Sequence, residues 1–159
     1  MARPLEDEPL RASILDRLSG LERVGRFAGR QNLDEFIASV HRDLQDLLNS
    51  RWRVSQWPPG LEELDNSLVN YGIPDFTGAN MSSPNDRSQF CELVEKAIRL
   101  HDPRFLSVRI RFKDNPDQLD RTLHFQIEAV VMASPEPAEV TFDTDVDPTS
   151  HRIHVKLNQ

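Results

Sequence analysis

The chain has little of several features that would narrow its function. It has one cysteine, Cys91, so no internal disulfide can form, which suits a reducing compartment. No apolar run approaches the roughly 18 residues of a membrane-spanning helix, and no signal-peptide pattern opens the chain. Basic residues are in the minority, because 19 Lys and Arg stand against 26 Asp and Glu and give a net charge of −7. This balance argues against nucleic acid and anionic lipid as partners and predicts a cytoplasmic protein without direct membrane insertion.

Motifs that carry catalysis or ligand binding are also missing from the sequence. There is no glycine-rich phosphate loop, no paired-cysteine metal pattern and no pair of histidines within a predicted helix. With 26 carboxylates, some pair will stand at glycosidase distance by chance, so that observation alone carries little weight. The sequence therefore predicts no catalytic residue, no cofactor and no metal site.

Two parts of the chain differ in composition. A length of 159 residues allows one domain, or one domain with a tail. Residues 1–31 combine many charges with three glycines and one short amphipathic stretch, which predicts a flexible N-terminal arm. A helix this short is not stable alone in water, so it must dock on its own domain or on another chain. Residues 32–159 are expected to form the folded domain.

Apolar residues recur at helical spacing in two segments of this domain. They predict helices over residues 33–48 and 84–100. Ser83 as cap, Pro84 at the first position and Asp86 in the first turn agree on where the second helix begins. On the first helix, His41 and Asp43 are expected to face solvent. Cys91 lies beside the apolar stripe of the second helix and is interpreted as a packing residue.

From Phe105 onward the apolar period switches from 3.6 to 2, which predicts four strands in an antiparallel meander. The buried face of the first strand is expected to consist of Leu106, Val108, Ile110 and Phe112. The predicted fold class is therefore α+β, with two main helices packed on a mainly antiparallel sheet of about four strands and a flexible N-terminal arm.

The last two predicted strands carry opposite charges on the same face. Cross-strand pairs of opposite charge stabilise a hairpin and oppose register slips. A cation site in the acidic series is the alternative, but alternation along a strand spaces its carboxylates by about 6.6 Å. No glycine turn or terminal Glu supports a calcium loop, so charge pairing is the preferred interpretation. The acids are Glu139, Asp143, Asp145 and Asp147, and the cations opposite them are Arg152, His154 and Lys156.

A charged tripeptide, Asp102-Pro103-Arg104, lies between the second helix and the first strand. The proline moves Asp102 out of helical geometry and can hold the carboxylate and the guanidinium in defined directions. By themselves, these three residues are more simply interpreted as a helix stop with a local ion pair.

The order of several segments along the chain favours a functional interpretation of this tripeptide. The segments are Leu15-Asp16-Arg17-Leu18, residues 42–51, Leu68-Val69-Asn70-Tyr71-Gly72-Ile73-Pro74-Asp75-Phe76, Ile98-Arg99-Leu100-His101-Asp102-Pro103-Arg104-Phe105, Val108-Arg109-Ile110 and Phe125-Gln126-Ile127-Glu128-Ala129. Together they resemble the TssE family, the baseplate wedge components of type VI secretion systems, with relatives in contractile phage tails. The resemblance runs from roughly Ile14 to Val131, and Asp102 stands where the family's loop usually has Glu.

This resemblance implies a non-enzymatic assembly protein at the cytosolic face of the inner membrane. It would contact other baseplate wedge proteins and offer contractile sheath subunits a platform on which to polymerise. Because a meander leaves at least one open edge, β-strand augmentation is the expected mechanism. Partner-binding roles are expected for Asp102, Pro103 and Arg104, for Tyr71 and Asp75, and for Asp16 and Arg17 in the arm.

An older lysozyme-like label of the family supplies the alternative, a peptidoglycan-cleaving hydrolase with Asp102 or Glu128 as general acid. Such an acid needs a raised pKa inside a sugar-lined cleft. Asp102 adjoins a cation, however, and Glu128 is expected on the polar face of a strand. A chain without an export signal would also have no access to peptidoglycan. A generic small-ligand-binding domain is a third alternative, which nothing in the sequence recommends.

Overall fold

A computed structural model describes residues 33–52, 60–61, 63–64, 67–75, 83–113, 122–133, 136–147, 150 and 152–158, together with residue 18. The expected arm over residues 1–31, with Asp16 and Arg17, therefore lies outside the described residues except for Leu18. The named elements are, in chain order, α3 (Leu33–Asn49), the 3₁₀ turn η2 (Leu68–Asn70), α4 (Pro84–His101), β1 (Phe105–Lys113), β2 (Leu123–Val131), β3 (Ala138–Val146) and β4 (Ile153–Asn158).

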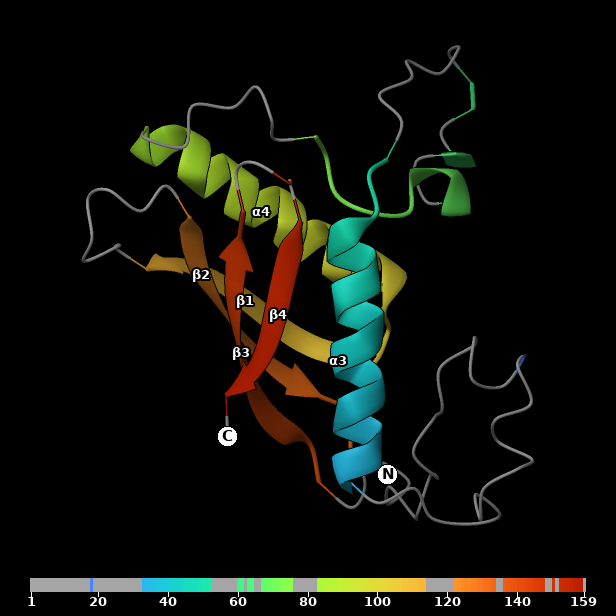
Figure 1. Cartoon of the computed structure of the whole chain (residues 1–159). Helices are drawn as coiled ribbons and strands as arrows, with labels where there is room; N and C mark the ends of the chain where they lie inside the picture. Colours follow the sequence, from blue (N-terminus) through green and yellow to red (C-terminus); the bar gives the residue numbers. More distant parts are fainter. Residues whose placement is uncertain are drawn as a thin grey trace, which may run out of the picture.

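The four strands form one antiparallel sheet in the order β1-β2-β3-β4, so each strand pairs with its neighbour in sequence. Both long helices pack on this sheet, α4 against β1 and α3 against β4, and Figure 1 shows α3 running alongside β4. The α+β class and the meander predicted from the switch of period are confirmed.

One face of the sheet is apolar and meets the helices. On β2 and β3 every second side chain is buried, as the period-2 pattern predicts. The helices bury their own apolar stripes against this face, and Phe36, Phe125 and Phe142 are among its fully buried side chains. At the start of α4, the Ser83 hydroxyl accepts a hydrogen bond from the Asp86 N–H at 3.4 Å, which confirms the predicted cap.

The start of β1 departs from the expected alternation. The register against β2 shifts between Phe105 and Ser107, which leaves Leu106 as an extra residue in a β-bulge. As a result Phe105 takes the buried position, and Leu106, expected in the core, is 50% exposed. A bulge depends on how two strands pair, so alternation within one strand could not predict it.

The opposite face of the sheet is polar and carries the predicted cross-strand charges. Lys156 Nζ lies 2.6 Å from an Asp145 carboxylate oxygen, and His124 Nδ1 lies 2.8 Å from the other one. Asp143 pairs with Lys113, which reaches across from β1. Of the predicted pairs between β3 and β4, these contacts confirm Lys156 with Asp145, whereas Lys113 and His124 come from β1 and β2.

His41 on α3 does not face solvent as expected. Its Nε2 lies 2.8 Å from the carbonyl oxygen of Val155 on β4, and its ring stacks on Phe142 with centroids 6.1 Å apart. The helix packs with this side toward the sheet, so a residue beside the apolar stripe reaches the edge of β4.

Candidate assembly interface

The predicted tripeptide folds into a compact ion pair where α4 turns into β1. Arg104 donates from Nε to Asp102 Oδ1 at 2.9 Å and from Nη2 to Asp102 Oδ2 at 2.7 Å. The Arg104 backbone N–H donates to the same Oδ1 at 3.0 Å. Pro103 lies exposed at the tip between them. Because two parallel hydrogen bonds hold the planar guanidinium against the planar carboxylate, this geometry fixes the direction of the guanidinium.

Helix α3 supplies the remaining partners of this guanidinium. Arg104 Nη2 donates to Asp43 Oδ2 at 2.7 Å, and Nη1 donates to the Ser39 hydroxyl at 3.2 Å. The guanidinium carbon also lies 6.0 Å from the ring centroid of Phe36. Arg104 therefore connects the α4–β1 corner to α3, across 61 residues of sequence.

Asp43 was expected on the wet side of α3, and this prediction is wrong. Its side chain is only 16% exposed, and those of Arg104 and Asp102 are 11% and 13% exposed. Ser39 and Asp43 lie four residues apart, on one face of α3, next to the apolar stripe. That spacing was readable in the sequence, but only the fold shows that Arg104 reaches it.

The charges around Arg104 reinforce one another. Burial by itself would lower the pKa of Arg104, but the hydrogen bonds and charges of Asp102 and Asp43 outweigh it and raise that pKa. Asp43 Oδ1 is buried and has no hydrogen-bond partner, although Arg42 Nε approaches it to 3.7 Å. The network therefore needs its buried cation, because its loss would leave two largely buried carboxylates without compensation.

The loop carrying Tyr71 and Asp75 lies close to the same network. The Tyr71 ring packs edge-on against His101 at 5.2 Å between centroids, and His101 Nε2 lies 3.1 Å from the Asn70 carbonyl oxygen. Burial raises the pKa of Tyr71, and the charges of Asp43, Asp46 and Asp102 raise it further. Tyr71 therefore lies within range of the charges of the Arg104 network and contacts His101, which precedes Asp102.

Asp75 lies at the exposed end of this loop, where its charge acts on Arg51 rather than on Arg104. Burial lowers the pKa of Arg51, and the Asp75 charge opposes that effect. The loop is tied to the end of α3 by an isolated bridge between Arg51 and Ile73, in which Ile73 N–H donates to Ser50 O at 3.0 Å. The backbone therefore fixes the loop beside α3.

Exposed apolar side chains surround the tripeptide. Pro103 is exposed, Leu106 is 50% exposed and Met132 is 48% exposed. The Met132 N–H donates to the Arg104 carbonyl at 2.8 Å, which places β2's end beside the loop. Exposed apolar side chains beside an ordered loop are a feature of protein-binding surfaces.

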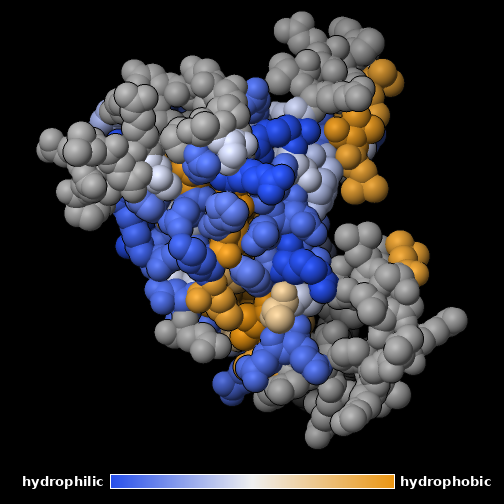
Figure 2. All heavy atoms as spheres, viewed as in Figure 1, coloured by the Kyte–Doolittle hydropathy of each residue, from blue (hydrophilic) through white to orange (hydrophobic). Residues whose placement is uncertain are grey.

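A second exposed apolar group lies on the segment of residues 60–70. Leu68 is 83% exposed, Val69 is 52% exposed and Leu61 is 46% exposed. Figure 2 shows hydrophobic side chains over this segment, at the upper right of the view, while most of the other coloured atoms are hydrophilic, apart from a narrow hydrophobic strip in the centre.

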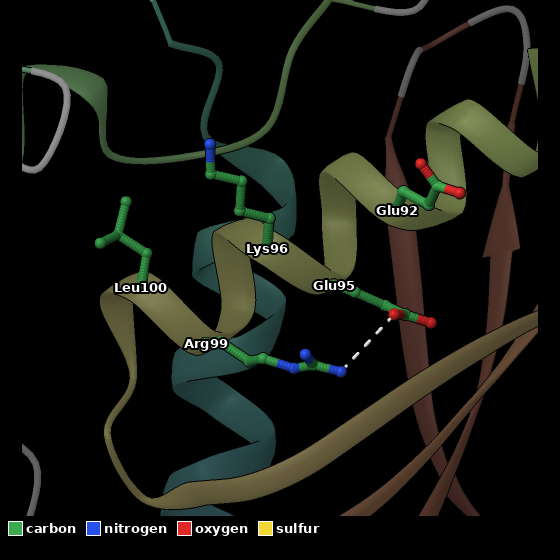
Figure 3. Close-up of a pocket in the computed structure, with 5 residues that line it drawn as sticks. All are labelled: Glu92, Glu95, Lys96, Arg99 and Leu100. Carbon is green, nitrogen blue, oxygen red and sulfur yellow. Dashed lines mark ion pairs between the residues drawn. The ribbon is translucent and has the colours of Figure 1, made fainter.

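An open groove of about 440 Å³ lies along α4. It is lined by Glu92, Glu95, Lys96, Arg99 and Leu100, with Glu95 and Arg99 turned toward β1 (Figure 3). Within the described part of the chain, no group of three or more His, Cys, Asp or Glu side chains could hold a metal ion.

A family model covers most of the elements that build this site. It matches residues 34–136 and describes the baseplate wedge protein gp25, under the family name GPW_gp25. The chain belongs to this family. The match spans α3, α4, β1 and β2, and so includes both partners of every Arg104 hydrogen bond described above. It confirms the resemblance to baseplate wedge proteins seen in the sequence.

A comparison with solved structures finds a similar fold in another protein chain. The chain is similar to a solved chain described as "The baseplate complex from the type VI secretion system", with a TM-score of 0.51 and 16% sequence identity. The alignment covers 79% of this chain and 96% of that one. A sequence comparison with curated proteins finds no match. None of the helices in the described residues combines the length and apolar character that a bilayer crossing requires.

Proposed function

We propose that this chain is a structural subunit of the baseplate of a type VI secretion machine, a contractile injection system. In this role it links other baseplate wedge proteins to contractile sheath subunits and initiates sheath assembly by β-strand augmentation. It works in the cytoplasm, assembled at the cytosolic face of the inner membrane. It uses neither a cofactor nor a catalytic residue.

The observation that carries this proposal is the baseplate wedge family match over residues 34–136. The fold shared with a chain of a type VI baseplate complex supports the choice of machine. The four-stranded sheet supports the mechanism, because its two outer strands, β1 and β4, are the edges at which a partner strand can be added.

The Arg104 network and the exposed apolar side chains around it are the proposed contact with wedge partners. Asp102 and Arg104 are largely buried and paired with each other, so they hold the loop in shape. The exposed Pro103 then presents the contact surface, and Tyr71 and Asp75 extend it along the neighbouring loop. Asp16 and Arg17 are proposed to dock as the arm orders on a partner.

The geometry does not favour the hydrolase alternative. A glycosidase needs a carboxylic acid that is free to deliver its proton to the leaving group. Asp102 instead accepts three hydrogen bonds from Arg104, and Glu128 lies 3.5 Å from Arg111 on the polar face of the sheet. Both candidate acids are thus engaged with cations.

The test is co-purification of the full chain with the wedge and sheath proteins of the same secretion system. Pro103→Glu places a charge on the exposed tip without removing any hydrogen bond of the network. Pro84→Glu is the matched control, because Pro84 is exposed at the far end of α4 and an acid suits the first turn of a helix.

We expect wild type and Pro84→Glu to bind wedge proteins alike, and Pro103→Glu to bind them at least tenfold more weakly, with unchanged thermal stability. Equal binding by all three chains would refute the proposed contact. If no form binds any wedge or sheath protein, the baseplate role itself is wrong, and peptidoglycan hydrolysis by the purified chain would then support the alternative.

A further inference from the structure

One edge of the sheet is β1, and two side chains of α4 cover part of it. Glu95 Oε1 accepts a hydrogen bond from the Ile110 N–H at 2.8 Å, and Arg99 Nη2 donates to the Val108 carbonyl at 2.8 Å. These backbone groups therefore point away from β2. The alternation of an antiparallel ladder places the N–H and C=O of Phe112 on the same outer edge. We call Glu95 and Arg99 the β1 caps.

On the other edge, β4, side chains of α3 cover Ile153 and the carbonyl of Val155. Asn49 accepts from the Ile153 N–H at 3.0 Å and donates to the Ile153 carbonyl at 2.9 Å. His41 Nε2 lies 2.8 Å from the carbonyl oxygen of Val155, and its ring is stacked on Phe142. We call His41 and Asn49 the β4 caps. His41 is stacked on Phe142, so it leaves this edge only if α3 moves, whereas Asn49 is exposed at the last residue of the helix.

The β1 caps are held more loosely than His41. The side chains of Glu95 and Arg99 are 24% and 54% exposed and lie 3.6 Å apart as an ion pair. Both are long, and Figure 3 shows them extending from α4 toward β1 beside an open groove. Rotation about their own side-chain bonds therefore frees the edge while α4 stays in place. A surface ion pair contributes little to stability, so it does not oppose this displacement strongly.

A strand added to β1 would replace the two hydrogen bonds that the β1 caps make to its backbone. Its backbone carbonyl would accept from the Ile110 N–H, and its N–H would donate to the Val108 carbonyl. It would also pair with Phe112, whose outer backbone groups the β1 caps do not reach. At the other end, the bulge at Leu106 limits regular pairing to the strand beyond it.

The charges on the outer face of β1 indicate the chemistry of the added strand. Arg109, Arg111 and Lys113 alternate along this face and are exposed. Arg111 and Lys113 pair with Glu128 and Asp143, whereas Arg109 forms no ion pair with any residue that the structure describes. Acidic residues at alternate positions of the incoming strand would lie opposite these cations.

We propose that β1 is the edge that accepts a strand from a contractile sheath subunit, that this strand is acidic at alternate positions, and that the β1 caps close the edge until it arrives. This inference rests on the proposed baseplate function and adds the edge, the chemistry of the strand and the side chains that control access. A closed edge also keeps two free copies of the chain from pairing through their sheets.

The first test asks whether the β1 caps protect the edge in the free, full-length chain. The test variant is Glu95→Ala/Arg99→Ala. Its control is Glu92→Ala/Lys96→Ala, which changes the same groove without touching β1. Amide exchange of Ile110, followed by NMR, should become about tenfold faster in the test variant, because its hydrogen bond to a charged acceptor is lost. It should not change in the control, and unchanged exchange in both variants would overturn the role of the caps.

The second test locates the added strand, using purified sheath subunits of the same secretion system. Binding should protect the Phe112 amide from exchange and leave the Leu157 amide of β4 unchanged. The test variant should bind at least as tightly as wild type, since no caps need displacement. Weaker binding would make Glu95 and Arg99 direct contacts and overturn their role as caps.

The remaining outcomes separate this inference from the proposed function. New protection of Leu157 would place the strand on β4 and refute the inference, while the assembly role stands. A complex without protection at either edge would refute strand addition altogether. Failure of the chain to bind any wedge or sheath protein would instead count against the proposed function itself.

Discussion

Replacing Arg104 by methionine should be among the most damaging single changes at the surface of this domain. The variant keeps much of the aliphatic stem but removes the cation from between Asp102 and Asp43. Both carboxylates are largely buried, with side chains 13% and 16% exposed. Their charges would then lie largely out of water without the cation between them, and the corner between α4 and β1 would lose the hydrogen bonds of Arg104 to α3.

The expected size of this effect follows from the burial of the network. Removing one partner of a buried ion pair typically costs about 3–5 kcal/mol. Because the three side chains keep 11–16% of their exposure, we expect the lower end of this range, about 3 kcal/mol. For a chain of this size, roughly 2–4 °C of melting temperature corresponds to each kcal/mol, so the midpoint should fall by about 6–12 °C.

The measurement is urea denaturation of wild type, Arg104→Met and the control Arg109→Met. Arg109 is exposed, so its replacement should change the free energy of unfolding by less than about 0.5 kcal/mol. A cost below about 1 kcal/mol for Arg104→Met would refute the reasoning from burial. A double-mutant cycle with Asp43→Asn should show a coupling of about 1–3 kcal/mol, and strict additivity would contradict the direct contact.

Three further predictions follow from single positions. Gly72→Ala should lower the free energy of unfolding by more than about 2 kcal/mol, because φ is +120° and the new Cβ would lie 2.4 Å from Ser50 O. Gly60→Ala is the control, with φ of +96° and open space around the new Cβ, and should cost only about 1 kcal/mol. Equal losses of stability in thermal melts of the two variants would refute the clash. Burial, and then the charge of Glu95, raises the pKa of Cys91 from 9.0 to about 11. Iodoacetamide at pH 7.5 should therefore alkylate Cys91 about 100-fold more slowly than an unperturbed thiol, and a rate near that of free cysteine would contradict the burial. Thr144→Val should leave the protein as stable or stabilise it by about 1 kcal/mol, because the buried hydroxyl has no hydrogen-bond partner, and a clear loss in urea denaturation would indicate that it does have one.

The network also decides how the assembly role can be tested. Substitution of Arg104 lowers stability, so weaker binding by an Arg104 variant would not by itself locate a contact. Pro103 is exposed and takes no part in the hydrogen bonds, and it separates the two effects. For this reason the binding experiment is built on Pro103→Glu and its control at Pro84.

Local periodicity was enough to predict the elements. The helix predicted over residues 33–48 ends at Asn49, and the one predicted over 84–100 ends at His101. The cap at Ser83 was read correctly, because a cap involves residues three positions apart. The family resemblance was readable for a related reason, since it depends on short segments in a fixed order.

The sequence by itself determined the α+β class and the alternation of buried and exposed positions on β2, β3 and β4, because these follow from spacings within one helix or one strand. Only the tertiary structure decided that Asp43 is buried against Arg104 and that His41 covers the carbonyl of Val155 on β4. These contacts join residues 61 and 114 positions apart. Amphipathic patterns show which face of a helix is buried, but the groups it meets there are set by how helices and sheet pack.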